Sequence, residues 1–167
     1  MPRPPRYLPA NYVCHVTNRG VFGTELFSDQ EGYETFISIL STSQKKFRMK
    51  ICAYCLMPNH WHLALWPDES NQVSIFIHYA TTLHVKVWNK RWKSNGHIYQ
   101  GRFKSRVIEN TNYYYNLVKY IEQNPIKAGL VKRAEQWQWS SAAGSSKLIL
   151  SPGPVPLPDN WLDIVNS

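Results

Sequence analysis

Hydrophobic residues alternate with polar ones in some parts of the chain and recur at helical spacing in others. Residues 11–18 alternate and are rich in strand-forming side chains, which predicts a first strand. Apolar side chains then recur at steps of three and four residues, at Tyr33, Phe36, Ile37 and Leu40. This spacing predicts a helix over about residues 30–46. Asp29 or Ser28 is its expected cap, because either side chain can accept from a free backbone amide of the first turn.

Two apolar segments, residues 49–57 and 60–66, have the length of strands and flank Pro58 and Asn59. Proline and asparagine favour tight turns, so these segments are expected to form a hairpin. Beyond this hairpin, apolar positions again follow helical spacing as far as Trp92, which predicts a second amphipathic helix.

Alternation returns at residues 103–109, where a short strand is expected. Thr111 is the expected cap of a third helix that ends near Asn124, because Pro125 disfavours helical backbone at the residue before it. The predicted order is therefore strand, helix, strand, strand, helix, strand, helix. Its first six elements match the split βαβ order of a ferredoxin-like fold, an α+β antiparallel sheet flanked by helices.

A length of 167 residues favours one domain, which we assign to residues 1–143. Residues 144–167 carry four closely spaced prolines and are expected to form an extended tail whose last apolar residues dock back on the domain. No window approaches the roughly 18 apolar residues of a membrane span, and the start of the chain lacks the apolar core of a signal peptide. We therefore expect a soluble, cytoplasmic protein with no membrane partner.

Basic and aromatic residues are both abundant. The chain has 19 Lys and Arg against 11 Asp and Glu, a formal net charge of +8, and 14% of its residues are aromatic. Basic charge attracts phosphates and flat rings stack on bases, which favours a single-stranded nucleic acid as partner. A basic, aromatic-rich globule without that partner would have the same composition.

The three cysteines argue against a disulfide framework, because their number is odd in a chain of this size. Cys52 and Cys55 have a CxxC spacing, but residues three apart on a strand point to opposite faces. No second CxxC is present to complete a zinc site. Buried structural thiols are the expected outcome.

His60 and His62 lie two residues apart on a predicted strand, so both imidazoles share one face while Trp61 points to the other. Two neighbouring imidazoles form half of a divalent-metal site. Alone, however, this pattern is more often a pair of surface or hydrogen-bonded histidines. His15, on the first strand, is a further candidate for the same site, although a packed or surface histidine is the more frequent case.

Tyr120 and Asn124 lie four residues apart and therefore on one face of the third helix. A phenol is a poor nucleophile unless a cation activates it or its target, and Asn124 offers an oxygen ligand beside the histidines. The same spacing also fits Tyr120 as a core residue. Tyr113, Tyr114 and Tyr115 compete for the nucleophile role, but only Tyr120 has a side-chain oxygen donor four residues on.

Three blocks of sequence together resemble the REP-associated tyrosine transposases, bacterial relatives of the single-tyrosine HUH transposases of small insertion sequences. They are AYCLMPNHWHL at 53–63, QGRFKS at 100–105, and YIEQNPIKAGLV at 120–131 followed by Trp139, Ser140 and Ser141. The opening HVTNRG at 15–20 fits the first strand of that family. The resemblance spans about residues 7–143.

The resemblance implies a specific chemistry. His60 and His62 match the HUH metal ligands for Mg²⁺ or Mn²⁺, Tyr120 matches the nucleophile, and Asn124 matches the third ligand, where glutamine is often found. The implied activity is metal-dependent cleavage and transfer of single-stranded DNA through a 5′-phosphotyrosine link, on a REP-type hairpin, by a monomer or homodimer. The residues expected to hold the DNA backbone are Arg19, Arg102, Lys104, Arg106 and Lys119.

Two other hypotheses stay open at this point. A non-catalytic module of this topology could bind single-stranded nucleic acid by stacking and charge alone. A metal-dependent nuclease using water would cleave without a protein adduct.

Overall fold

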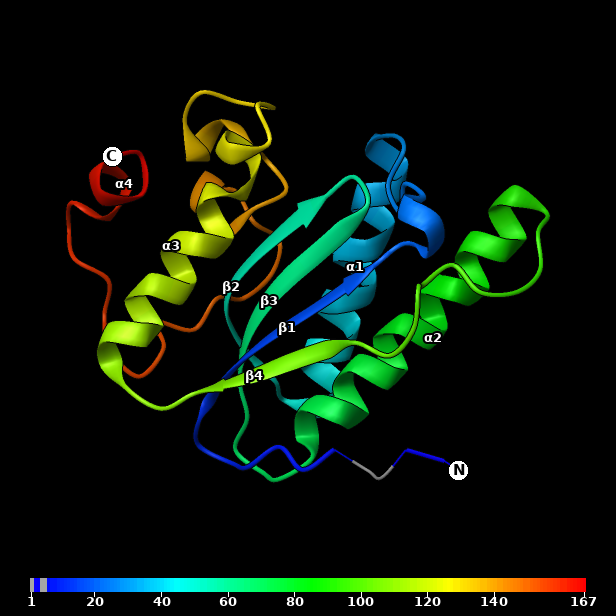
Figure 1. Cartoon of the computed structure of the whole chain (residues 1–167), viewed down its shortest axis with the longest axis horizontal. Coiled ribbons are helices and arrows are strands. Elements are labelled where there is room, and N and C mark those ends of the chain that lie inside the picture. The colour runs from blue at the N-terminus through cyan, green and yellow to red at the C-terminus, as the bar shows by residue number, and fades with distance from the viewer. Residues whose placement is uncertain (1, 4–5) are drawn as a thin grey trace.

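A four-stranded antiparallel sheet forms the centre of the protein, in a computed structural model that describes residues 2–3 and 6–167 (Figure 1). The strand order is β2-β3-β1-β4. The strands are β1 (Val13–Arg19), β2 (Lys50–Met57), β3 (His60–Trp66) and β4 (Lys104–Ile108). This arrangement confirms the predicted ferredoxin-like α+β fold.

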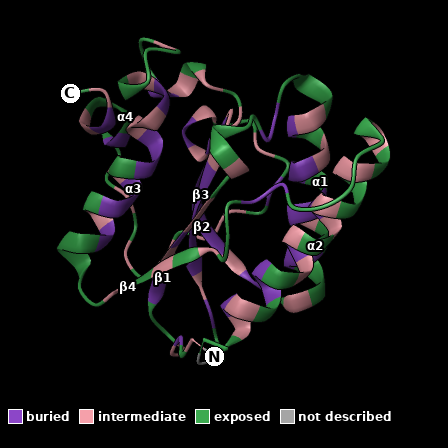
Figure 2. Cartoon of the chain, turned by 45° about the vertical axis from the view of Figure 1, so that its right-hand side comes forward, coloured by how far each residue is buried: buried purple, intermediate pink, exposed green. Residues whose placement is uncertain are grey.

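Helices cover both faces of this sheet (Figure 1). Helices α1 (Gln30–Phe47) and α2 (Gln72–Trp92) pack together on one face, and α3 (Thr111–Lys127) lies on the other, mainly against β2. Each side has its own apolar core, and Figure 2 shows buried strands between helices whose outer sides are exposed. The remaining helical segments are α4 (Trp161–Val165) and the 3-10 turns Val21–Gly23, Ala134–Gln136 and Ser141–Ala143.

Side-chain caps mark the starts of α1 and α3. Asp29 caps α1 as predicted, since its carboxylate accepts from the Gly32 amide at 2.9 Å. The cap of α3 is Asn110 and not Thr111, because the side-chain Oδ1 of Asn110 accepts from the Tyr113 amide at 3.0 Å. None of the helices among the described residues is long and apolar enough to cross a membrane.

Helix α3 continues through Pro125 to Lys127, so the predicted end near Asn124 was wrong. Proline has no N–H to give to the carbonyl four residues earlier, which is that of Ile121. The Asn124 side chain compensates, because its Nδ2 lies 2.8 Å from the Tyr120 carbonyl and 3.4 Å from that of Ile121. The helix therefore continues past Pro125, and these hydrogen bonds fix the orientation of the Asn124 side-chain amide.

The cysteines depart from one prediction. A β-bulge between Ile51 and Ala53 shifts the register of β2, and Cys52 and Cys55 both pack in the core on the α3 side. Their expected separation to opposite faces was therefore wrong. All three cysteines are free and buried, and burial raises the pKa of Cys52 to about 11. These groups stay protonated thiols, which agrees with the structural role predicted for them.

The proline-rich tail returns along β2 and α3 (Figure 1). The Ser151 amide donates to the Ile51 carbonyl at 2.8 Å, and the Tyr115 hydroxyl donates to the Pro156 carbonyl at 2.9 Å. At the end of the tail, Trp161 and Val165 are buried against α3. The last apolar residues thus dock on the domain.

Glu122 joins α3 to this tail from a buried position with 3% exposure. Its carboxylate accepts from the Ser141 hydroxyl at 2.7 Å and from the Trp161 indole N–H at 2.8 Å. Burial raises the pKa of Glu122, while the two hydrogen bonds oppose that shift. Ionised Glu122 is therefore a cost to the folded state that these donors only partly offset.

We expect the Glu122→Gln side chain to accept from the Trp161 indole N–H through its amide oxygen, to donate its amide N–H to the Ser141 hydroxyl, and to remove the cost of ionisation. Because the folded-state pKa is raised, the free energy of unfolding of the wild type should fall relative to that of Glu122→Gln as pH rises from 4 to 7.5. Glu122→Ala leaves the Trp161 donor unpaired and should lose about 2–4 kcal/mol at neutral pH. Urea unfolding of the three proteins across this pH range measures both effects. A constant difference between wild type and Glu122→Gln would contradict the pH effect.

Candidate active site

The register of the sheet gathers imidazoles and basic side chains on the face that α3 covers. His60 lies opposite Arg19, His62 opposite Thr17, and Thr17 in turn opposite Lys104. In the next row, His15 lies opposite Arg106. Partners in an antiparallel ladder share a face, so these strands present one polar surface beneath α3.

His62 is the most buried member of this surface, with 5% exposure. Its Nδ1 lies 2.9 Å from His15 Nε2, and the two rings stack with centroids 5.2 Å apart. Its Nε2 is buried and has no hydrogen-bond partner among the described residues. Burial, together with the neighbouring His15, His60 and Arg19, lowers the pKa of His62 to about 3. This imidazole is therefore neutral at physiological pH.

His60 lies at the start of β3 and is half-buried. Its Nδ1 is 2.7 Å from Asn59 Oδ1, and its ring centroid is 5.0 Å from that of His62. Burial lowers the pKa of His60 and so does Arg19, whereas a contact with the Asn124 side chain raises it. Trp61 points to the opposite face as predicted, where its indole N–H donates to the Tyr99 hydroxyl at 3.1 Å.

Tyr120 extends from α3 over these histidines. Its ring centroid lies 5.5 Å from that of His62 and 5.9 Å from that of His15, and in both cases the rings meet edge to face. Tyr120 keeps 44% of its surface exposed, so the alternative of a core residue is wrong. A substrate arriving from solvent can reach this ring.

The neighbouring tyrosines are placed differently. The hydroxyls of Tyr114 and Tyr115 donate to tail carbonyls, those of Pro152 and Pro156. Tyr113 is exposed on the same side of α3 as Tyr120, but lies seven residues and about two turns earlier. Tyr120 is thus the member of this group that the structure brings to the histidines.

The donors near Tyr120 suit a divalent cation. Asn124 donates through Nδ2 to the helix carbonyls, which leaves its Oδ1 available as a ligand. His62 has a buried nitrogen, Nε2, with no hydrogen-bond partner among the described residues. Neutral imidazole and amide oxygen are both metal ligands. The described residues contain no group of three or more His, Cys, Asp or Glu side chains placed to hold a metal. The donor set here is two imidazoles and one amide oxygen, and a divalent cation held by them would need further ligands from substrate or water.

The predicted DNA-binding residues fall in three places. Arg19, Lys104 and Arg106 lie on the histidine-bearing face of the sheet and are exposed. Lys119 is half-buried on α3, about 100° around the helix from Tyr120. Arg102 lines a groove elsewhere.

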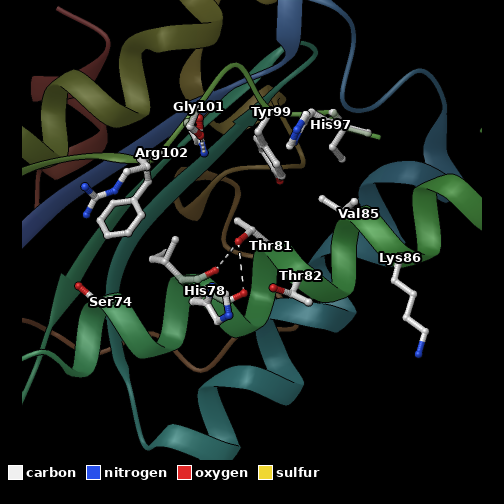
Figure 3. A pocket seen from close by; sticks show the side chains of 14 residues that line it. Ser74, His78, Thr81, Thr82, Val85, Lys86, His97, Tyr99, Gly101 and Arg102 are labelled. Atoms are coloured by element: carbon white, nitrogen blue, oxygen red, sulfur yellow. Dashed lines mark hydrogen bonds between the residues drawn. The ribbon is translucent and has the colours of Figure 1, made fainter. Parts of the chain in front are cut away.

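This groove has a volume of about 770 Å³ and lies between α2 and the segment before β4 (Figure 3). His78, Thr82 and Lys86 of α2 line one side of the groove, and His97 and Arg102 line the other, with the Lys86 side chain pointing away from His97 (Figure 3). Neither Tyr120 nor the His60 and His62 pair lines the groove, and no carboxylate is among its lining residues. Its surroundings suit an anionic ligand outside the histidine site.

Sequence reasoning missed two neighbours of the site. Lys127 places its ammonium 5.5 Å from the centre of the Tyr120 ring, and its spacing of two helical turns from Tyr120 was the available signal. Asn59 Oδ1 lies against Nδ1 of His60. His15, a candidate for this site from the sequence, lies against Nδ1 of His62, and its ring centroid is 5.9 Å from that of Tyr120.

The family described as "Transposase IS200 like" matches residues 11–124, well over half of the chain. The chain belongs to this IS200-like transposase family. Membership supports a DNA-processing enzyme. The match contains the whole set of His60, His62, Tyr120 and Asn124.

Named relatives are consistent with this membership. A REP-associated tyrosine transposase of Escherichia coli K12 is 30% identical over 100 residues, which cover 55% of this chain and 53% of the relative. A Haemophilus influenzae protein that carries the same name provisionally is 27% identical over 150 residues, covering 79% of this chain and 85% of the relative.

A solved structure shares the fold of this IS200-like transposase. It is a REP-associated tyrosine transposase bound to a REP hairpin, with a TM-score of 0.71 and 21% identity. The similarity covers 86% of this chain and 84% of the other. The resemblance to REP-associated tyrosine transposases therefore holds in sequence and in fold.

Proposed function

We propose that this protein cleaves and rejoins single-stranded DNA through a covalent link to Tyr120. The observation that carries the proposal is the placement of an exposed tyrosine ring 5.5 Å from the ring of His62. The Nε2 of His62 is buried and has no hydrogen-bond partner in the part of the chain that the structure describes. Membership of a transposase family supports strand transfer over simple binding.

In the cleavage step, the Tyr120 oxygen forms a bond to phosphorus and the bond from phosphorus to the 3′ oxygen breaks. The phenol loses its proton and the released 3′ oxygen gains one, so the products are a 5′-phosphotyrosine and a free 3′-OH. A later 3′-OH attacks this link and returns the tyrosine hydroxyl. One phosphodiester replaces another, so the exchange needs no ATP.

His60, His62 and Asn124 are the residues that would hold a divalent cation, Mg²⁺ or Mn²⁺. When bound, the cation neutralises charge that develops on the phosphate. The protein's own part is to keep both imidazoles neutral by burial and to hold Tyr120 beside them on α3.

Arg19, Lys104 and Arg106 would hold the DNA backbone, because they lie in the same sheet face as the histidines. Lys119 and Arg102 would add phosphate contacts at α3 and at the groove of Figure 3. We extend to this chain the DNA of the solved relative, a REP hairpin, and place the cleaved bond in its single-stranded flank. The protein acts as a monomer or a homodimer.

Tyr120→Phe should abolish the covalent adduct, because it removes the attacking oxygen and leaves the rest of the side chain in place. A labelled REP-type hairpin oligonucleotide with a single-stranded flank, incubated with Mn²⁺ and resolved by denaturing electrophoresis, measures the adduct. Tyr113→Phe is the matched control, exposed on the same side of α3 about two turns away, and should retain wild-type adduct.

The other hypotheses give different results in this assay. Cleavage without adduct that survives Tyr120→Phe would indicate a nuclease using water. Binding without cleavage, indifferent to EDTA, would indicate a non-catalytic module.

His60→Ala and His62→Ala should each weaken Mn²⁺ binding by at least about 100-fold, since a ligand is lost and not only its support. Electron paramagnetic resonance of free Mn²⁺ measures this without DNA. Tyr120→Phe should bind Mn²⁺ as the wild type does. Unchanged binding in both histidine variants would remove these residues from the metal site.

Lys104→Ala and Arg106→Ala should each weaken DNA binding and reduce the slope of log affinity against log salt by about 1, as expected for one lost phosphate contact. Fluorescence anisotropy of a labelled hairpin across a salt series gives the slope. Lys45→Ala, on α1 across the sheet, is the control of equal charge and should leave the slope unchanged. Equal slopes for all four proteins would place the DNA elsewhere.

A further inference from the structure

The two histidines proposed as metal ligands are held in the same way. Each has its Nδ1 against a neighbouring side chain, His60 against Asn59 at 2.7 Å and His62 against His15 at 2.9 Å. A neutral imidazole carries one proton, so the group at Nδ1 decides which nitrogen keeps a lone pair. The partners therefore bear directly on whether Nε2 can bind a cation.

For His60, the hydrogen-bond partner determines which ring nitrogen carries the proton. The oxygen of Asn59 can only accept, so Nδ1 of His60 carries the hydrogen and Nε2 keeps the lone pair. Asn59 belongs to the turn between β2 and β3, directly before His60.

For His62 two arrangements are possible, because His15 is itself an imidazole. If His15 donated to His62 Nδ1, the proton of neutral His62 would lie on Nε2, where it would be buried with no acceptor. If His62 donates, its Nε2 presents a lone pair instead. Buried N–H groups without acceptors are rare in folded proteins, which favours the second arrangement.

We propose that His15 is a positioning residue: its Nε2 accepts the Nδ1 proton of His62 and so keeps the His62 Nε2 lone pair free for a cation. This inference rests on the metal role of His62 in the proposed function. His15 does not contact the cation and acts through His62 alone.

The fold keeps His15 suited to this task. It lies on β1 diagonally across the ladder from His62, since His15 pairs with Ala64 and His62 pairs with Thr17. Its Nε2 lies 2.9 Å from His62 Nδ1, within hydrogen-bond distance. A ring nitrogen that carries no proton accepts a hydrogen bond, so His15 Nε2 can take the Nδ1 proton of His62.

Two substitutions distinguish the loss of the hydrogen-bond acceptor from the loss of the volume of the ring. His15→Leu removes the acceptor and keeps a side chain of similar size, whereas His15→Gln keeps an oxygen that can accept from His62. His78→Leu, on α2 at the other face of the sheet, is the control for loss of a histidine outside the proposed metal site. Both readouts are made without DNA, so the position of His78 in the groove of Figure 3 does not enter them. Circular dichroism and thermal unfolding establish that each variant is folded.

The first readout is the tautomer of His62 in the metal-free protein, from the two-bond couplings of its ring nitrogens in ¹⁵N NMR. Wild type, His15→Gln and His78→Leu should show the proton on Nδ1, and His15→Leu should show it wholly or partly on Nε2. His60 should stay protonated on Nδ1 in every variant, because Asn59 is unchanged.

The second readout is Mn²⁺ affinity by electron paramagnetic resonance. His15→Leu should bind about 10–100-fold more weakly than wild type, and His15→Gln within about threefold, as expected for the partner of a ligand. A folded His15→Leu with an unchanged His62 tautomer, or a His15→Gln as impaired as His15→Leu, would overturn the inference. If wild type bound no Mn²⁺, the metal role in the proposed function would fail, whereas the tautomer measurement would still decide whether His15 sets the His62 proton.

Discussion

The packing of α3 across the sheet is the constraint on which the candidate site depends. Leu117, Val118 and Ile121 are buried in the core that α3 shares with β2 and β3. Tyr120 lies between these positions along the helix, so their packing determines the position of its ring relative to the histidines. A rotation or slide of α3 would leave the imidazoles in place and remove the tyrosine from them.

Several contacts prevent such a slide. Glu122 ties α3 to the Ser141 turn and to Trp161, and Gln123 donates to the carbonyl of Val165 at 2.9 Å. The C-terminal segment therefore contributes to the position of Tyr120 without touching it. Burying a carboxylate costs free energy. The position of Glu122 therefore fits a role in orienting α3 more than a role in stabilising the fold.

The histidines show a similar balance between burial and use. Placing His62 at 5% exposure costs the free energy of removing a polar ring from water, and its Nε2 has no hydrogen-bond partner among residues 2–3 and 6–167. The same burial keeps the ring uncharged and its lone pair available. An unsatisfied atom of this kind is expected at a functional site and is otherwise rare.

Much of the fold was predictable because the pattern of the chain is locally consistent. The alternation around His60 and His62 and the helical spacing before Tyr120 gave the elements, their order and the shared face of the two imidazoles. Membership of the transposase family agrees with that prediction, while the roles of Tyr120, His60, His62 and Asn124 stay proposals.

The predictions that were wrong depend on side-chain contacts and strand irregularities that the hydrophobic pattern does not encode. Pro125 was expected to end α3, but the Asn124 side chain replaces the missing donor. The β-bulge in β2 brings Cys52 and Cys55 to the same face, and no local signal in the sequence marked it. The two roles considered for His15 could not be distinguished without the register of β1 against β3, which sequence spacing does not contain.

The return of the C-terminal segment also determines how the sheet can associate. The outer side of β2 is hydrogen-bonded to its own chain, since the Leu56 amide donates to the Trp139 carbonyl and the Ser151 amide to that of Ile51. A strand from a second copy would have to displace these segments to pair there. The other edge of the sheet is β4, which carries the exposed Lys104 and Arg106. Exposed basic side chains on an edge strand oppose pairing with a further strand, so both edges of this sheet disfavour its extension.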